Sequence, residues 1–236
     1  MKYRTLGQGL KVSAIGVGCM PMIRNGNINY GGAADLDEAT RAIHRAIELG
    51  ITFFDTAQIY GPFQNEELLG EAIKGKRDGL VIATKFGFSF QDGQITGVDG
   101  SAANAKASVE GSLKRLGIDT IDLFYQHRVD PNVPIEDTVG GMAELVKEGK
   151  VRHIALSEAG PETIQRAAKV HPITALQSEY SLWERGVEEG ILDACRENSS
   201  GFVPYSPLGR GFRAGTIRSL DDLPADDRRR SDPRYQ

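Results

Sequence analysis

The chain has 236 residues, of which 40% are hydrophobic and 25% charged, so it falls in the range of globular proteins with one large domain or two small ones. Its net charge of −4 provides no basic surface, and no stretch approaches the ~18 apolar residues of a membrane span, so we expect neither nucleic acid nor membrane as a partner. The amino terminus lacks the apolar region of a signal peptide, and Cys19 and Cys195 form no C-x-x-C pair, which favours a cytoplasmic protein without a disulfide framework or zinc site.

The predicted elements alternate between strands and helices, beginning near the amino terminus. An apolar strand over Val12 to Gly18 precedes a helix in "DEATRAIHRAIELG", where Gly50 supplies the stop signal. A second strand in "ITFFDT" precedes a helix in "NEELLGEAIKG", for which we expect Asn65 as the N-cap and Gly75 as the stop. A third strand in "LVIATKF" is followed, after a loop, by a helix with Ser101 as its cap.

The same pattern continues through the second half of the chain. Strands are expected in "IDLFYQH", "VRHIALS", "ITALQSEYS" and "GFVPYSPLG", and helices in "PIEDTVGGMAELVKEG", "PETIQRAAKV" and "VEEGILDACREN". Each of the seven strands except the last therefore precedes a helix. This order predicts right-handed crossovers and a parallel α/β sheet, either an open doubly wound sheet or a β/α barrel.

Polar residues at the strand ends favour the barrel. Asp55, Lys85, His127 and Ser157 each stand at the carboxyl end of an apolar strand, and in a β/α barrel all such ends meet at one face. A doubly wound sheet that binds a dinucleotide should carry G-x-G-x-x-G after its first strand. Here the first strand leads into "GVGCMPM", which lacks the third glycine.

A buried ion pair is expected between Lys85 and Asp55, because lysine is rarely buried without a partner and Asp55 ends the preceding strand. The pKa of a free tyrosine is near ~10, so Tyr60 needs its pKa lowered by about three units to exchange a proton at neutral pH, and charged Lys85 is a cation that can lower it. His127 can donate a hydrogen bond to a carbonyl oxygen and place it against Tyr60. The set indicates a general acid for carbonyl chemistry, and it contains neither a nucleophile–base pair nor a metal-binding cluster.

Each of these residues also has a purely structural interpretation. Asp55 can be a helix N-cap or only the salt-bridge partner of Lys85, Tyr60 can be a packing aromatic with a hydrated hydroxyl, and His127 can be a core histidine. The interpretation as an active site depends on the four residues occurring together.

Six stretches, taken in chain order, resemble the motifs of the aldo-keto reductase family: "FFDTAQIYG", "IATKFG", "DLFYQHRVDP", "GKVRHIALSE", "LQSEYSLW" and "FVPYSPLGRGF". The resemblance implies a (β/α)8 TIM-type barrel with an amino-terminal β-hairpin, for which "KYRTLGQGLKVS" fits. It implies hydride transfer between a nicotinamide cofactor, usually NADP(H) with NAD possible, and a small aldehyde or ketone. It also implies that Tyr60 donates the proton, that Lys85 and Asp55 tune Tyr60 for this role, and that His127 orients the carbonyl.

The resemblance further implies a set of cofactor-binding residues. Ser157 and Gln177 match residues that hold the nicotinamide carboxamide, and Tyr205 matches an aromatic residue at the nicotinamide ring. Glu158 stands where many family members have Asn. The remaining matches are Ser206, Leu208, Gly209 and Arg210 for the pyrophosphate loop, and Gly18, Cys19 and Met20 for the mouth of the barrel near the first strand.

The chain departs from the family pattern after about residue 215. It continues as "RAGTIRSLDDLPADDRRRSDPRYQ", so the eighth strand, its helix and the segment that holds the adenosine 2′-phosphate are not expected. The prediction is therefore a single, incomplete barrel domain over residues 1–236, with a loop or disordered tail over about 216–236. The open barrel edges are expected to permit self-association.

Two alternatives to a carbonyl reductase stay open. The first is a catalytically silent or regulatory protein on the same scaffold. The expected lack of the eighth strand and of the segment that holds the 2′-phosphate favours this alternative. The second is a Schiff-base lyase, because a lysine at a barrel strand end is also what that chemistry uses. An ion pair with Asp55 would keep Lys85 charged and so argues against the second alternative.

Overall fold

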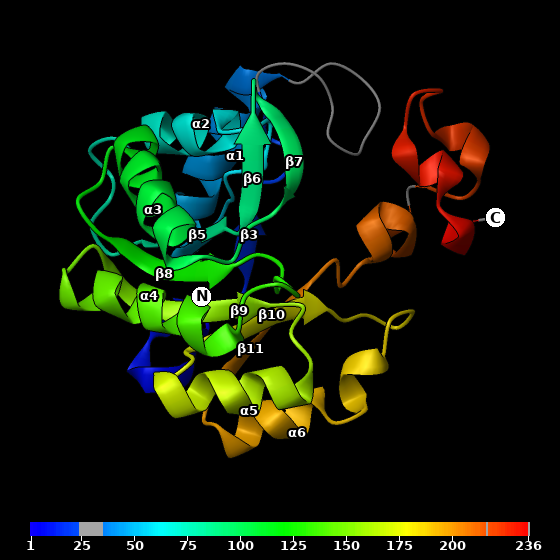
Figure 1. Ribbon diagram of the computed structural model, residues 1–236. Helices are drawn as coiled ribbons and strands as arrows, with labels where there is room; N and C mark the ends of the chain where they lie inside the picture. Colours follow the sequence, from blue (N-terminus) through cyan, green and yellow to red (C-terminus); the bar gives the residue numbers. More distant parts are fainter. Residues whose placement is uncertain (24–34, 216, 236) are drawn as a thin grey trace.

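The main body of the molecule is a parallel sheet of seven strands that curves into a nearly closed barrel (Figure 1). The computed structural model describes residues 1–23, 35–215 and 217–235. Neighbouring strands pair in the order β11-β10-β9-β8-β5-β4-β3, and every pair is parallel. The strands are β3 (Gly16–Gly18), β4 (Phe53–Asp55), β5 (Val81–Phe86), β8 (Ile121–Gln126), β9 (Val151–Ser157), β10 (Ala175–Glu179) and β11 (Gly201–Tyr205).

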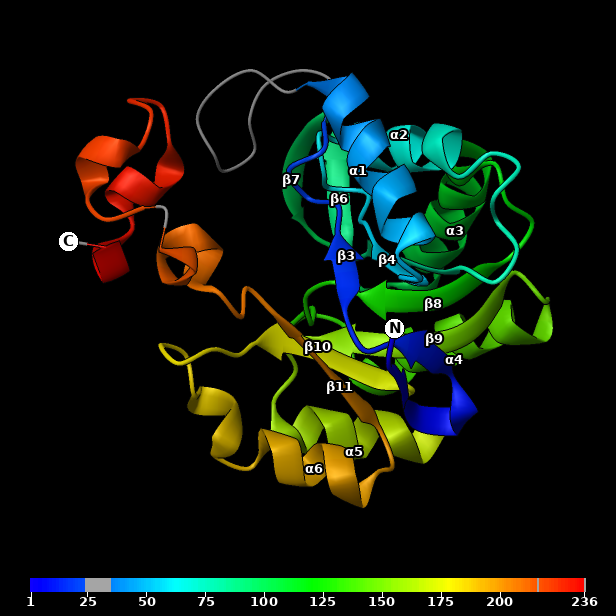
Figure 2. The same ribbon diagram turned by 180° about the vertical axis from the view of Figure 1, so that it is seen from behind.

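Helices cover the outer face of this sheet, which confirms the β/α barrel over the doubly wound alternative (Figure 2). They are α1 (Leu36–Glu48), α2 (Gln64–Ala72), α3 (Ala102–Leu116), α4 (Ile135–Lys147), α5 (Pro161–Val170) and α6 (Ile191–Glu197). The Ser101 side chain accepts a hydrogen bond from the Asn104 amide, so the predicted cap of α3 is confirmed. No helix in the described ranges is long and apolar enough to cross a bilayer.

Two layers of apolar side chains hold the barrel together, because successive residues of a strand point to opposite faces. The inner layer includes Phe53, Ala83, Leu123, Tyr125, Ala155 and Ala175. The outer layer, between sheet and helices, includes Phe54, Ile82, Phe124, Ile154 and Leu176. This alternation fixes which polar residues at the strand ends point into the barrel.

The predicted amino-terminal hairpin is present at the amino ends of the barrel strands. It consists of β1 (Tyr3–Thr5) and β2 (Lys11–Ser13), which pair antiparallel. The predicted strand over Val12 to Gly18 is wrong as a single element, since the chain turns between β2 and β3. The Ser13 hydroxyl causes the break, because it donates to the Ile15 carbonyl (2.7 Å) while accepting from the Thr52 amide (2.9 Å).

Asn65 is not the N-cap of α2, contrary to the sequence-based expectation. The cap position is Phe63, in a left-handed conformation, and Asn65 is fully buried inside the helix. Its amide donates to the carbonyls of Cys19 (2.5 Å) and Met22 (2.6 Å) and accepts from the Thr56 hydroxyl (2.5 Å). The side chain therefore joins the ends of β3 and β4 instead of satisfying its own helix.

β3 and β11 are the two ends of the sheet. Within the part of the chain that the structure describes, β3 pairs only with β4 and β11 only with β10. The prediction that the first and seventh strands have open edges is therefore confirmed. Self-association through these edges stays a prediction.

A second hairpin was not expected from the sequence. It consists of β6 (Phe88–Gln91) and β7 (Gln94–Val98), and it follows β5 directly, with Gly87 at φ 119° between them. The Asp92-Gly93 turn is a recognisable hairpin signal, and Phe88 and Phe90 alternate with polar residues in β6, but β7 is exposed throughout. The hairpin places Phe88 close to the carboxyl end of the barrel.

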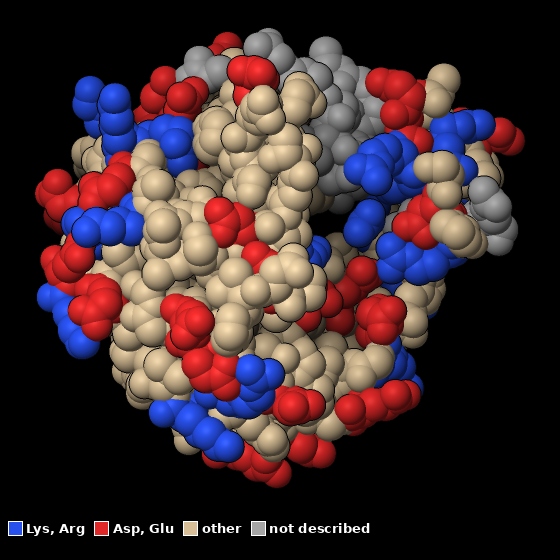
Figure 3. All heavy atoms as spheres, in the orientation of Figure 1, with Lys and Arg blue, Asp and Glu red and all other residues tan. Residues whose placement is uncertain are grey.

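The C-terminal segment lies on the side of the carboxyl ends of the strands. Residues 216 and 236 lie outside the described residues, and 217–235 contain three short 3₁₀ turns, Leu220–Asp222, Arg228–Ser231 and Pro233–Tyr235. Arg234 pairs with Glu179 at the end of β10 (2.6 Å). Figure 3 shows a hollow between the barrel and this segment, with acidic and basic side chains mixed around it.

Candidate active site

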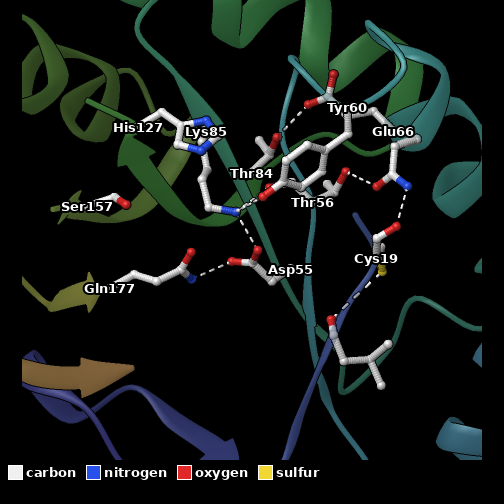
Figure 4. Close-up of polar contacts among 12 residues, drawn as sticks. Cys19, Asp55, Thr56, Tyr60, Glu66, Thr84, Lys85, His127, Ser157 and Gln177 are labelled. Carbon is white, nitrogen blue, oxygen red and sulfur yellow. Dashed lines mark hydrogen bonds and ion pairs between the residues drawn. The ribbon is translucent and has the colours of Figure 1, made fainter. Parts of the chain in front are cut away.

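Residues from six neighbouring strands point into the carboxyl end of the barrel. Each is two residues beyond an apolar or small residue of the barrel interior, so the strand alternation turns it inward. Six of the predicted residues thereby point toward the same end of the barrel, and Figure 4 shows all of them except Tyr205. The inward-facing residues are Asp55, Lys85, His127, Ser157, Gln177 and Tyr205.

Lys85 is at the centre of this group, with its side chain fully buried. Its Nζ forms the predicted ion pair with Asp55 and donates to the Thr56 carbonyl (2.8 Å). The Tyr60 hydroxyl lies 3.4 Å from the same nitrogen. The second carboxylate oxygen of Asp55 accepts from the Gln177 amide (2.8 Å), so both oxygens of Asp55 are hydrogen-bonded.

Lys85 keeps its charge at neutral pH. Burial lowers its pKa, but Asp55 and, to a smaller extent, Tyr60 raise it, and the sum is a pKa above the ordinary value. A lysine in this state is a poor nucleophile because its lone pair is protonated. The site therefore holds a permanent cation against the Tyr60 hydroxyl.

The pKa of Tyr60 is raised, which corrects the expectation that Lys85 brings it down toward neutrality. Burial raises the pKa, and the opposing effect of Lys85 is smaller. Tyr60 thus holds its proton at neutral pH, as a proton donor must. Lys85 can therefore stabilise a phenolate that forms at this position, but it does not create one at neutral pH.

His127 is a neutral imidazole beside Tyr60. Burial, together with the charges of Lys85 and Arg128, lowers its pKa well below the ordinary value. The ring lies edge-on to that of Tyr60 at 6.0 Å between centroids and edge-on to Phe88 at 5.2 Å. Its Nδ1 is buried without a partner in the described ranges. A neutral imidazole retains one N–H, which can donate to a carbonyl oxygen placed against Tyr60.

Of the three residues expected to line the mouth near the first strand, the structure brings Gly18 to the site. Gly18 pairs in register with Asp55, and the space above its Cα is open. Cys19 is one residue further and therefore faces the opposite side, where it is buried in the outer layer. Because the side chain faces this outer layer, only the main chain of Cys19 can face the mouth. Burial also raises the pKa of its thiol to about 12. Met20 is partly buried.

The segment after β11 contains the residues that are expected to bind a pyrophosphate. Burial raises the pKa of the Tyr205 hydroxyl at the end of β11, and Glu158 adds to this effect. Ser206, Gly209 and Arg210 have positive φ values of 51°, 57° and 53°, and Leu208 is 57% exposed. The Arg210 Nε is buried without a hydrogen-bond partner in the described ranges, so this nitrogen is available to donate to an anion.

Two residues that sequence reasoning missed also contact the site. Arg128 follows His127 and donates from Nη1 to the His127 carbonyl (2.6 Å) and the Ser157 hydroxyl (3.4 Å). Phe88 forms a wall against the His127 ring. The position of Arg128 at a strand end was a usable signal, whereas Phe88 depends on the unpredicted hairpin.

Comparison with known proteins gives a consistent result. The family model described as "Aldo/keto reductase family" matches residues 14–235. The glycerol dehydrogenase AKR11B4 from Gluconobacter oxydans matches with a TM-score of 0.86 and 29% identity, over 99% of this chain and 72% of that chain.

Two further solved structures are similar. The holo form of aldo-keto reductase AKR11C1 from Bacillus halodurans has a TM-score of 0.81 and 33% identity, over 96% of this chain and 72% of its own. The thermostable aldo-keto reductase Tm1743, solved with the inhibitor epalrestat, has a TM-score of 0.77 and 31% identity, over 94% and 79% of the two chains.

Proposed function

This chain belongs to the aldo/keto reductase family of oxidoreductases, and on that premise we propose that it reduces an aldehyde or ketone to the alcohol with Tyr60 as general acid. The observation that carries the proposal is the contact between the Tyr60 hydroxyl and the buried, charged Lys85. A cation beside a buried phenol reduces the cost of releasing its proton, because it stabilises the phenolate that forms.

The chain's own residues would donate the proton and position the substrate. When bound, the reduced nicotinamide supplies the hydride to the carbonyl carbon. Tyr60 donates a proton to the carbonyl oxygen, and the phenolate that remains is stabilised by Lys85. His127 donates a hydrogen bond to the same oxygen and so fixes the carbonyl against Tyr60.

The cofactor is proposed to be NADP(H), with NAD(H) as the second choice. Ser157 and Gln177 would hold the carboxamide, and Tyr205 would contact the nicotinamide ring. Gly18 leaves room at the first strand. The pyrophosphate would be held by the loop after β11, through Ser206, Leu208, Gly209 and Arg210. The unpartnered Nε of Arg210 supports this assignment.

Lys85 is not well suited to Schiff-base chemistry. That reaction needs a neutral amine, whereas Asp55 and Tyr60 hold the pKa of Lys85 above its ordinary value. A silent protein on the same scaffold would not need a protonated tyrosine, a charged lysine and a neutral histidine in contact. The reductase is therefore the function that these residues support best.

We predict that the purified chain consumes NADPH only when an aldehyde such as benzaldehyde is present. The fall in NADPH absorbance measures the rate, and the same assay with NADH gives the cofactor preference. Treatment with borohydride and the same aldehyde should add no mass to Lys85.

Two results would contradict this proposal. NADPH binding without turnover across aromatic and aliphatic aldehydes and ketones would favour the silent protein. A borohydride-trapped adduct on Lys85 would favour the lyase. Lys150 is a suitable internal control for trapping, because its side chain is accessible yet also ion-paired.

A further inference from the structure

Arg128 is a cation at the site for which the reaction described above has no use. It follows His127 directly and is partly buried. Both of its hydrogen bonds come from Nη1, to the His127 carbonyl (2.6 Å) and to the Ser157 hydroxyl (3.4 Å). Since arginine has five N–H donors on three nitrogens, Nη2 and Nε remain available to a ligand.

No carboxylate of the described ranges forms an ion pair with Arg128. The acidic side chains nearby have other partners. Glu158 accepts from the Glu179 amide (3.1 Å) and contacts the Tyr205 hydroxyl, and Asp55 is occupied by Lys85 and Gln177. The Asp130 carboxylate accepts from the amides of Gly100 (2.9 Å) and Asn132 (2.8 Å). The guanidinium thus has no carboxylate within ion-pair distance in the described ranges.

Such an arrangement is costly unless something else binds there. A partly buried cation loses hydration, and this loss is offset when a carboxylate forms two parallel hydrogen bonds with the guanidinium. Lysine or glutamine could make the contacts to the main chain and to Ser157 equally well. An arginine with two free nitrogens is instead suited to a planar anion.

The guanidinium is also close to the reacting atoms. It is one of the charges that lower the pKa of His127 and oppose the rise in the pKa of Tyr60. The ring of Phe88 lies edge-on to that of His127, at 5.2 Å between centroids. A substrate whose carbonyl lies against Tyr60 and His127 would therefore have both an apolar ring and a cation near it.

We propose that Arg128 binds a carboxylate group of the substrate, so that the chain prefers aldehydes or ketones that carry an acid group over their neutral analogues. The proposal rests on the carbonyl reductase function proposed above. Arg128 contributes specificity, while the proton transfer remains with Tyr60. The anion that it binds belongs to the substrate and not to the phosphates of the cofactor.

The test compares meta- and para-carboxybenzaldehyde with the corresponding formylbenzamides, which have the same shape without the charge. For the unmodified chain, kcat/KM for the better acid should exceed that for its amide by about 10- to 100-fold, the usual worth of a charged hydrogen-bonded pair. In Arg128→Gln this ratio should fall to about 1. Arg128→Lys, which retains the charge, should keep part of the preference.

Arg152→Gln is the matched control. Arg152 is on β9, at the opposite end of the barrel, and its side chain is 64% exposed. This variant should keep the acid-to-amide ratio of the unmodified chain. An equal ratio in Arg128→Gln and in the unmodified chain would overturn the proposal. A rise in the Kd of NADP⁺ with an unchanged ratio would assign Arg128 to the cofactor and overturn it as well.

A binding measurement separates this proposal from the proposed function. Calorimetry with para-toluate and para-toluamide, in the presence of NADP⁺, reports carboxylate binding without turnover. Tighter binding of toluate that is lost in Arg128→Gln supports the proposal even where no aldehyde is reduced, and only the reductase function would then fail. Equal binding of toluate and toluamide by the unmodified chain contradicts the proposal directly.

Discussion

Replacement of Tyr60 by phenylalanine should lower kcat for aldehyde reduction by about 10²- to 10⁴-fold, the usual worth of a positioned general acid. Phenylalanine keeps the ring and its edge-on contact with His127, so the pocket should retain its shape. The only group lost is the hydroxyl that lies 3.4 Å from the Lys85 nitrogen. NADPH affinity, measured by fluorescence titration, should stay within about threefold of that of the unmodified chain. The hydroxyl is expected to donate the proton in the reaction and not to bind the cofactor.

Tyr125→Phe is the matched control for this loss. Tyr125 is fully buried inside the barrel, and its ring lies near the same Lys85 nitrogen. Its hydroxyl is buried beside Gln177 and is not expected to reach the substrate. If Tyr60→Phe kept activity within a few-fold, or if Tyr125→Phe lost as much, Tyr60 would not be the acid.

The second large effect concerns the ion pair of Asp55 and Lys85. Asp55→Asn and Lys85→Met should each lower kcat/KM by about 100-fold or more. Lys85→Met removes the cation that stabilises the phenolate of Tyr60, and Asp55→Asn removes the carboxylate that holds Lys85 charged. Each should also destabilise the fold by about 3–5 kcal/mol, because it leaves one buried charge without its partner. The Lys85 side chain is 0% exposed and that of Asp55 only 15%.

The double variant Asp55→Asn/Lys85→Met should cost less than the product of the two rate losses and less than the sum of the two stability losses. Urea unfolding and steady-state kinetics measure the two quantities. The exposed pair of Lys147 and Glu144, with side chains 71% and 62% exposed, is the control, and its disruption should cost less than about 1 kcal/mol. Strict additivity of the Asp55 and Lys85 effects would mean that the two residues act independently.

The positions of the site residues could be predicted because the geometry of a parallel barrel constrains where strands end and which way their side chains point. Strand ends meet at one face, and residues two apart on a strand share a side. Asp55 and Lys85 end adjacent strands, so their pairing followed from the strand order alone. The same rules, correctly applied, would have excluded the Cys19 side chain, which is one residue beyond Gly18 and so faces outward.

Other features depended on contacts that sequence spacing does not reveal. A buried Asn65 that joins two strand ends has the same local pattern as an N-cap, and only the tertiary structure separates them. The direction of the Tyr60 pKa shift depends on whether burial or the charge of Lys85 has the larger effect. The contact of Phe88 with His127 depends on a hairpin whose second strand is exposed and gives no clear apolar pattern.

The central claim is that this chain transfers a hydride to a carbonyl carbon while Tyr60 supplies the proton. A single turnover with NADPH deuterated at the hydride-donating carbon tests it most directly. The account predicts that the alcohol formed from benzaldehyde carries one deuterium on its carbinol carbon, and that Tyr60→Phe forms this product far more slowly at the same cofactor occupancy. An alcohol without deuterium, or bound NADPH that is never oxidised in the presence of any aldehyde, would contradict it.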